Sequence, residues 1–434
     1  MFAVAAVAAQ KGREVMTIDI TGAFRHASMF PTGIDVYIRI DKNLAPILAS
    51  IDGIYHDMLN DDGTITVRLD KALYGCVEAA KLWYDELCGT LKDIGFTPNP
   101  EETCVFNKGV GESQVTIVLH VDDLLVTARD RKQLHHVADK LQAKYKKVQQ
   151  HSGPIVSYLG LTMDFSTPGE VRITQEGYID TLLTESGVEG TAKTPATEDL
   201  FVVRDGIELA SEEDSKWFHR QTARLLYLSK RTKPEILVAT AFLTTRVTKC
   251  DQDDLGKLRR LIRYVRSARD RGLCLKPGNE GCEVSIYIDA AYGVHSDCKS
   301  HTGSAIAVGQ AILDSSSKRQ GIVTKSSTEA ELVGASDELG KGFHMRRFIL
   351  NQGHNIGPVT LYQDNLSTMA LIDKGKSTSG RTRHVDIRYF WIKERIESGE
   401  VIVKHMGTTN MIADAMTKPL QGSEFTRERP YKLG

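Results

Sequence analysis

The chain has 434 residues, which is enough for two to four domains with substantial hydrophobic cores. Its 55 Lys and Arg residues nearly balance its 56 Asp and Glu residues, so any surface that attracts nucleic acid must be local. The seven cysteines are widely spaced and form no C-x-x-C pair, which argues against a disulfide framework and a zinc finger and favours a reduced, intracellular environment.

The first predicted elements are a short helix and a strand that ends near an aspartate. Residues 1–10 (MFAVAAVAAQ) carry no preceding basic residue and no cleavage signal, so we expect a helix end and not a signal peptide. No stretch approaches about 18 consecutive apolar residues, so no membrane span is expected. Residues 14–20 predict a strand with Asp19 near its end, and Phe24 follows five positions later. Residues 71–87 (KALYGCVEAAKLWYDEL) have helical spacing.

Residues 115–128 (VTIVLHVDDLLVTA) predict a β-hairpin with an acidic tip. Two apolar runs meet at Asp122 and Asp123, and side chains alternate along a strand, so one carboxylate should enter a site while the other lies beside it. A single aspartate holds magnesium poorly, because the ion demands an octahedron of oxygen ligands. Asp19 can supply the missing partner. The alternative is an ordinary solvated turn.

The middle of the chain is predicted to be mostly helical. A basic amphipathic helix is expected within 129–147, short strands and a linker within 150–200, and further helices over 212–246 and 251–271. In the last of these, DQDD supplies a cap and an acidic first turn. A run of lysines and arginines then faces an apolar stripe. Such a basic face is a solvated surface, a track for nucleic-acid phosphates or, least favoured, a membrane-surface helix.

The C-terminal part alternates strands and helices. Strands are predicted at 284–289, 303–308 and 311–315, followed by a helix that opens with a capping box at Ser326 and Glu329 and ends near Gly353. A strand at 359–363 delivers Asp364, and a helix begins at Asn365. A helix at 384–397, a strand at 400–405 and a last helix at 410–417 complete the order.

Several motifs in this order resemble those of copia-type LTR retrotransposons. DITGAF, ALYGCVEAAKLWY, HVDD and YLGLTMDF resemble their reverse transcriptase. IDAAY, SSTEAELVGA, YQDN, RTRHVDIRYFWIKE and IADAMTKPL resemble their RNase H domain. The resemblance implies an α/β protein with the α+β palm of a right-hand polymerase, a helical thumb or connection, and an RNase H-like mixed-sheet domain. The expected boundaries are 1–196 for a palm that lacks its fingers, 197–281 for the thumb or connection, and 282–424 for the RNase H-like domain.

For the polymerase half, the resemblance implies that Asp19 and Asp122 hold two magnesium ions, with Asp123 adjacent. One ion would activate a primer 3′-hydroxyl, and the other would neutralise the incoming triphosphate. Phe24 would be the gate that excludes a 2′-hydroxyl, or else a core residue. Glu78 stands where the family has glutamine and places a negative charge near the triphosphate. With the fingers missing as well, we expect little or no DNA synthesis from this chain alone.

For the RNase H half, the resemblance implies a two-metal site that gathers Asp289, Glu331, Asp364 and Asp414. Glu331 is preferred over Glu329, because Ala-Glu-Leu is the matching triplet and Glu329 already caps the helix. His405 would assist product release, or is an ordinary residue at a strand end. The remaining candidates for substrate phosphates, each with a solvated-surface alternative, are Arg263, Arg266 and Arg383.

The predicted function is therefore RNA-directed DNA polymerase and RNase H within a retrotransposon polyprotein, with Mg²⁺ or Mn²⁺ as the cofactor. The partners implied are an RNA template, a DNA primer, an RNA–DNA hybrid, deoxynucleotides and other products of the polyprotein. The expected location is intracellular, in cytoplasmic particles or in the nucleus. The alternatives are a truncated or domesticated remnant that binds nucleic acid or keeps only RNase H activity and, less favoured, a plain cellular RNase H.

Overall fold

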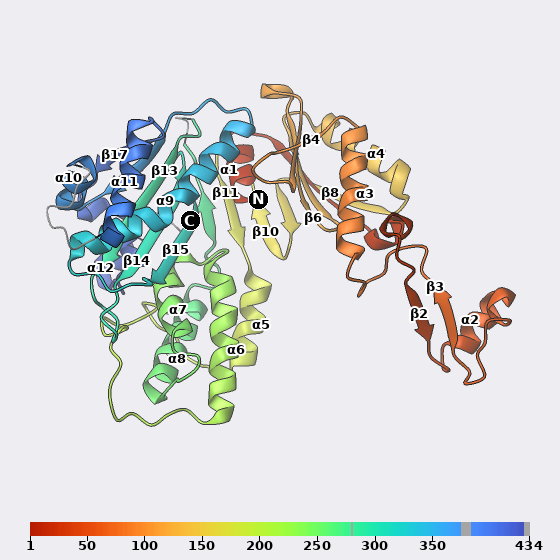
Figure 1. The fold of residues 1–434 in the computed structure, drawn as a ribbon, viewed down its shortest axis with the longest axis horizontal. Helices are drawn as coiled ribbons and strands as arrows, with labels where there is room; N and C mark the ends of the chain where they lie inside the picture. Colours follow the sequence, from red (N-terminus) through yellow and green to blue (C-terminus); the bar gives the residue numbers. More distant parts are fainter. Residues whose placement is uncertain (279–280, 375–382, 429–434) are drawn as a thin grey trace.

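The computed structural model describes residues 1–278, 281–374 and 383–428, without the side chains of 374, 383–387, 389 and 428. The fold is mixed α/β, as predicted, and three sheets and a helical layer form its body (Figure 1). Among the described residues, no helix combines the length and the apolarity that a bilayer crossing requires.

The N-terminal half is built on a six-stranded sheet with the order β4-β5-β6-β7-β1-β8. Helices α3 (Ala79–Asp93) and α4 (Arg131–Tyr145) contribute buried side chains to its core. The predicted strand and hairpin are the three strands at its centre. The strands are β1 (Glu14–Ile20), β4 (Thr97–Pro98), β5 (Val105–Lys108), β6 (Val115–His120), β7 (Asp123–Ala128) and β8 (Val148–Ser152).

A small arm projects from this sheet (Figure 1). It consists of the antiparallel strands β2 (Tyr37–Ile40) and β3 (Ile65–Arg68), with helix α2 (Ala45–Ile51) between them. Residues 71–78, which the sequence predicted to begin a helix, form turns instead, and α3 begins only at Ala79. Gly75 has a φ of +100°, which a right-handed helix cannot contain, so the prediction of a helix from residue 71 was wrong.

The middle of the chain forms a four-stranded sheet and a helical layer. The sheet has the order β12-β11-β10-β9, and its strands are β9 (Ile155–Tyr158), β10 (Leu161–Asp164), β11 (Val171–Thr174) and β12 (Leu273–Leu275). The helices are α5 (Glu176–Ser186), α6 (Glu212–Ser229), α7 (Leu237–Thr244) and α8 (Gln252–Ser267). The single helix predicted over 212–246 was wrong, because the chain breaks between α6 and α7 at Pro234 and the buried Lys233.

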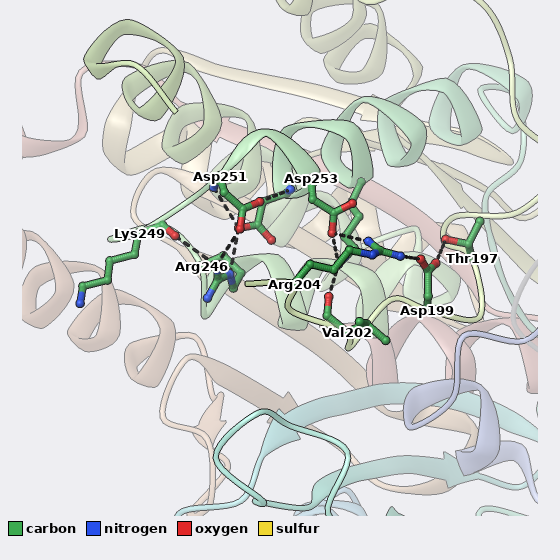
Figure 2. A network of polar contacts seen from close by, with 10 residues as sticks. Thr197, Asp199, Val202, Arg204, Arg246, Lys249, Asp251 and Asp253 are labelled. Carbon is green, nitrogen blue, oxygen red and sulfur yellow. Dashed lines mark hydrogen bonds and ion pairs between the residues drawn. The ribbon is translucent and has the colours of Figure 1, made fainter. Parts of the chain in front are cut away.

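The N-terminus of α8 is fixed by a network of carboxylates and arginines (Figure 2). Asp251 caps the helix and accepts from the backbone N–H of Asp254 at 2.9 Å, and Asp254 accepts from the N–H of Asp251 at 3.2 Å. Arg246 donates to both carboxylates, and Arg204 pairs with Asp253 at 2.8 Å. The acidic turn predicted from DQDD therefore caps its helix and ties it to the preceding segments.

The C-terminal part is a five-stranded mixed sheet with the order β15-β14-β13-β16-β17. The three strands β15, β14 and β13 are antiparallel, whereas β13, β16 and β17 run parallel. The strands are β13 (Val284–Ala291), β14 (His301–Val308), β15 (Ala311–Arg319), β16 (Val359–Gln363) and β17 (Val401–His405). The helices are α9 (Ser327–Asn351), α10 (Leu366–Lys374), α11 (Arg383–Glu397) and α12 (Gly422–Glu428).

One hydrophobic core joins the N-terminal half of the chain to the C-terminal sheet. Helix α1 (Phe2–Gln10) is made of small apolar residues and buries Ala3 to Ala9. It shares a cluster of buried side chains with strands β9 to β12 and with the C-terminal sheet and α9. Because this helix is apolar all round, it is stable only inside such a core.

Two buried histidines, His295 on the connection between β13 and β14 and His301 at the start of β14, form a polar chain with strand β15. The Nε2 atom of His295 lies 3.0 Å from the Nδ1 atom of His301, whose Nε2 atom lies 2.7 Å from the hydroxyl of Ser317. Burial lowers the pKa of His295 to about 4 and that of His301 to about 3. Neighbouring cationic groups add to the shift, with Arg319 acting on His295.

These pKa values predict loss of stability in acid. The unfolded chain, in which imidazole titrates near pH ~6.5, binds more protons than the folded chain below that pH. The contribution of the two histidines is complete above pH ~6.5 and is lost as the pH falls toward ~4. We expect the free energy of urea unfolding to fall by about 2 kcal/mol per histidine between pH ~7 and pH ~5. This fall in the free energy of unfolding should be smaller in His295→Gln than in the control His135→Gln, which changes an exposed histidine. Identical pH profiles for the two variants would contradict this.

Candidate active sites

Strand pairing brings the first predicted carboxylates together. In the antiparallel pair of β1 and β7, Asp19 lies directly opposite Asp123. Asp122 occupies the two-residue turn between β6 and β7, next to Asp123. All three side chains are half-buried. Three acidic groups from two separate segments therefore meet at one end of the sheet.

The turn at Asp122 and Asp123 is strained, and two hydrogen bonds from other elements hold it in place. Val121 has a φ of +54°, which is unusual for a β-branched residue. The indole Nε1 of the buried Trp83 donates to the carbonyl of Val121 at 2.6 Å, and the N–H of Ile20 donates to the carbonyl of Asp122 at 3.0 Å. These two bonds fix the backbone conformation of the turn. Trp83 lies on α3, within the range 71–87 for which the sequence indicated helical spacing.

The three carboxylates of this first cluster repel one another. Burial raises the pKa of Asp123, and the negative charges of Asp122 and Asp19 raise it further, while His120 opposes them. A cation at this cluster would relieve the repulsion.

The other polymerase-type candidates are Phe24, on a 3-10 helix (Ala23–His26) that follows β1, and Glu78, directly before α3. Phe24 is 8% exposed, and its ring meets that of Tyr74 edge-on with centroids 4.5 Å apart. Tyr74 itself is 73% exposed. Glu78 is half-buried at the N-cap position of α3, where its side chain makes no capping hydrogen bond.

The second cluster is tighter. Asp289 from β13, Glu331 from α9 and Asp364 after β16 each offer a carboxylate oxygen, and these atoms lie within 4.8 Å of one another. Asp289 and Glu331 are 3% and 4% exposed, whereas Asp364 is half-buried. The parallel pairing of β13 with β16 brings the ends of these two strands to the same edge of the sheet.

Neighbouring polar groups orient these three carboxylates. The N–H of Ala290 donates to Glu331 at 3.0 Å, and the amide of the buried Gln363 donates to the other oxygen of Glu331 at 3.3 Å. The hydroxyl of Thr408 donates to Asp364 at 3.1 Å. Even so, burial and the charges of Asp289 and Asp364 raise the pKa of Glu331 well above its usual value.

Asp414 approaches the same cluster through Lys418. The ammonium of Lys418 lies 3.0 Å from Asp414 and 3.5 Å from Asp289, and the hydroxyl of Thr417 also donates to Asp289. Burial and the charge of Asp289 raise the pKa of Asp414 to about 7, although Lys418 opposes the shift. Asp414 lies on a short 3-10 helix (Ile412–Met416) and not on the longer helix predicted over 410–417, so that prediction was wrong. The chain there turns tightly to pack against β14.

The remaining candidates lie in different surroundings. His405 is exposed at the end of β17 and pairs in register with Gln363, one residue before Asp364. Ser326 caps α9 by accepting from the N–H of Glu329, whereas the side chain of Glu329 accepts from the N–H of Lys325 at 2.8 Å and not from that of Ser326, so the predicted capping box forms only in part. Glu329 is not a member of the tight carboxylate group. Arg383 begins α11, but its side chain lies outside the described residues.

The two arginines predicted on the basic helix already have partners within the helical layer. Arg263 donates to the carbonyl of Glu189 at 2.9 Å, and Arg266 donates to the carbonyl of Val188 at 2.5 Å. Arg263 remains exposed, whereas Arg266 is half-buried. Their predicted contact with nucleic-acid phosphates stays a prediction.

The donor set at the second cluster fits a divalent cation. It consists of carboxylate oxygens, which hard ions such as Mg²⁺ prefer. The positive charge nearest to it, on Lys418, contacts Asp289 and Asp414 but is not bonded to Glu331 or Asp364 within the described residues. The raised pKa values of Glu331 and Asp414 mark negative charge that a bound cation would offset. Asp289, Glu331 and Asp364 are the residues that would hold it.

Several orienting residues were missed in the sequence. Lys418, Thr417, Thr408 and Gln363 contact the carboxylates, and Gly303 lies opposite Asp289 in the strand register. Lys418 follows Asp414 by four positions, a spacing that could have indicated a pair. The others carry no signal in spacing or composition, because their contacts are made between distant segments.

Comparisons with known proteins match most of the chain. Residues 3–198 match the family described as "Reverse transcriptase (RNA-dependent DNA polymerase)". The Pol polyprotein from transposon RE1 of Arabidopsis thaliana is 30% identical over 82% of this chain, and that from TNT 1-94 of Nicotiana tabacum is 24% identical over 96%. The matches cover only 24% and 31% of those polyproteins, so the chain spans about a quarter to a third of their length.

A solved structure of a foamy viral protease-reverse transcriptase, in complex with an RNA/DNA hybrid, is similar in fold. Its TM-score is 0.51 at 13% identity, and the match covers 91% of this chain and 44% of that one. The likeness therefore extends across both halves of the chain.

Because neighbouring atoms pack closely against Gly303, a substitution there should displace Asp414 without changing any carboxylate. A Cβ atom at Gly303 would lie 2.6 Å from the Cβ of Met416 and 2.7 Å from the Cγ2 of Thr417. Gly303→Ala should therefore displace the 3-10 helix and cost about 1–3 kcal/mol of stability. The control is Gly340→Ala, on an exposed face of α9 with no neighbour within 4 Å, which should be neutral or stabilising. Urea unfolding measures both, and equal stability of the two variants would show that the contact is not tight.

Proposed function

We propose that this chain, which belongs to the reverse transcriptase family of retrotransposon Pol polyproteins, has two nucleic-acid-processing sites. The site at Asp289, Glu331 and Asp364 hydrolyses the RNA strand of an RNA–DNA hybrid. The site at Asp19, Asp122 and Asp123 serves RNA-directed DNA synthesis. The proposed domains are 1–196, 197–281 and 282–424. The proposed location is intracellular, in cytoplasmic particles.

The convergence of three carboxylate oxygens within 4.8 Å is the observation that carries the hydrolytic proposal. In such sites, bound divalent ions generate hydroxide and stabilise the departing oxygen. Asp289, Glu331 and Asp364 would hold the ions, with Asp414 completing the set through its contact with Lys418. Ala290 and Gln363 keep Glu331 oriented before substrate arrives, so little reorganisation is needed. Lys418 adds a positive charge beside Asp289 and Asp414 that would attract a substrate phosphate.

The proposal is tested with the purified chain, a labelled RNA–DNA hybrid and millimolar Mg²⁺. We expect cleavage of the RNA strand only, and a rate at least about a hundredfold lower in Asp289→Asn, because several kcal/mol of transition-state stabilisation depend on the ions. Asp373→Asn is the matched control, since this exposed aspartate on α10 lies outside the cluster. Absence of cleavage by folded wild-type chain, or equal rates in the two variants, would refute the hydrolytic role.

DNA synthesis is the second proposed activity, and the register that opposes Asp19 and Asp123 supports it. We expect extension of a primed RNA template to be weak and to disappear in Asp122→Asn, while hydrolysis of the hybrid persists. Phe24 and Tyr74 are the proposed contacts of the incoming nucleotide. The alternative is a remnant that keeps only hydrolysis, and it would show no extension under any condition.

Glu78 is expected to weaken nucleotide binding through its charge. Removing a unit of like charge about 4 Å from a phosphate gains roughly 1 kcal/mol in water, so Glu78→Gln should raise extension about fivefold. Primer extension at subsaturating deoxynucleotide measures this. Asp93→Asn, at the exposed end of the same helix, is the control and should leave extension unchanged. An unchanged rate in Glu78→Gln would remove Glu78 from the nucleotide site.

A further inference from the structure

A cavity of about 210 Å³ lies at the junction of the two halves and is lined by basic side chains. Lys11 and Arg13 lie between α1 and β1, Arg129 follows β7, and His354 follows the C-terminus of α9. The loop that carries Glu112 forms another wall. Distant segments of the chain thus bring three permanent cations and an imidazole to one small space.

These cations are not neutralised by the carboxylate that lines the cavity. Glu112 lies 3.6 Å from Arg129, and both side chains are more than half exposed. Within the described residues, Arg13 donates to two neutral groups, the amide oxygen of Gln114 at 2.8 Å and the hydroxyl of Thr116 at 3.3 Å, and the charge of Glu112 acts on it without an ion pair. The ammonium of Lys11 makes no ion pair within the described part of the chain. The lining therefore carries an excess of two positive charges.

The nearby end of α9 does not compensate this excess. The C-terminal carbonyls of a helix attract cations, but here neutral amides bond to two of them. The amide of Gln114 donates to the carbonyl of Gln352 at 2.8 Å, and that of Asn99 donates to the carbonyl of Phe348 at 3.3 Å. The cations that line the cavity remain available to a ligand.

Two buried nitrogen atoms of the lining have no hydrogen-bond partner among the residues that the structure describes. They are the side-chain amide nitrogen of Gln352, a residue that is only 5% exposed, and the Nε2 atom of His354. The amide nitrogen of Gln352 is a donor, and Nε2 of His354 is one in the tautomer that carries its proton there. A buried donor without an acceptor is costly, and an oxyanion supplies several acceptors at once. Burial lowers the pKa of His354, and the positive charges of Lys11 and Arg13 lower it further, so this imidazole already lies in a cationic environment.

The cavity is separate from both carboxylate clusters. Arg13 precedes β1 and lies six residues from Asp19, which is about 20 Å along a strand. Gln352 lies 21 residues beyond Glu331, which is about 30 Å along α9. The volume is below the roughly 300 Å³ at which pockets for larger organic ligands begin.

We propose that this cavity is a binding site for a small phosphate anion, held by Lys11, Arg13 and Arg129 and by the buried nitrogens of Gln352 and His354. The anion lies between the N-terminal sheet and the end of α9, so its binding stabilises the contact between the two halves. The shared chemistry is a phosphate group, supplied either as free phosphate or pyrophosphate or as a phosphate ester.

Calorimetric titration of the full chain tests the site, in buffer with a chelator so that no divalent metal links the probe to the carboxylates. The probes are inorganic phosphate, pyrophosphate and thymidine monophosphate, and binding of the first two or of the third identifies the source. We expect one saturable site, about tenfold weaker in Lys11→Gln and weaker still in Lys11→Glu, because a charge-assisted contact is lost and then reversed. Lys11 is exposed, so neither variant should impair folding.

Lys140→Gln is the matched control, since it removes the same charge from an exposed position on α4 that does not line the cavity. It should bind as the wild type does. Absence of saturable binding up to about 10 mM probe, or equal affinity in wild type, Lys11→Gln and Lys11→Glu, would overturn the proposal.

Discussion

Repulsion between buried carboxylates is the constraint around which the C-terminal sheet is organised. Asp289 and Glu331 are almost inaccessible to water, and Asp364 and Asp414 lie beside them. An uncompensated cluster of this kind would favour an unfolded or protonated chain. The surrounding residues supply part of the compensation through an N–H group, an amide, two hydroxyls and the ammonium of Lys418. The negative charge that remains is what a bound divalent cation would offset.

Packing between distant segments, and not local sequence, brings these carboxylates together. The strand that carries Asp289 is central in its sheet, and the close contact at Gly303 lets the 3-10 helix with Asp414 lie against the neighbouring strand. The same sheet shares one core with the apolar helix α1 and with strands β9 to β12. A disturbance of that core would therefore reach both candidate sites.

The sequence predicted the elements whose pattern is local. Strand periodicity and an acidic turn were sufficient for the hairpin of β6 and β7, and capping residues were sufficient for α8 and α9. Kinship with copia-type Pol polyproteins and the mixed α/β fold are confirmed by the comparisons. The break at Pro234 was missed although the proline was a signal in the sequence, and the 3-10 helix of Asp414 was missed because packing against β14 overrides helical spacing there. The sequence did not predict the basic cavity, since Lys11, Arg129 and His354 come from distant segments.

Direct measurement of metal binding tests the central claim, that carboxylates from β13, α9 and β16 form a divalent metal centre. The calorimetric titration with Mg²⁺ uses the Asp19→Asn/Asp122→Asn double variant, because it lacks two carboxylates of the first cluster. We expect saturable Mg²⁺ binding by that chain and its loss when Glu331→Gln is added. Absence of binding, or binding that is unchanged by Glu331→Gln, would contradict it.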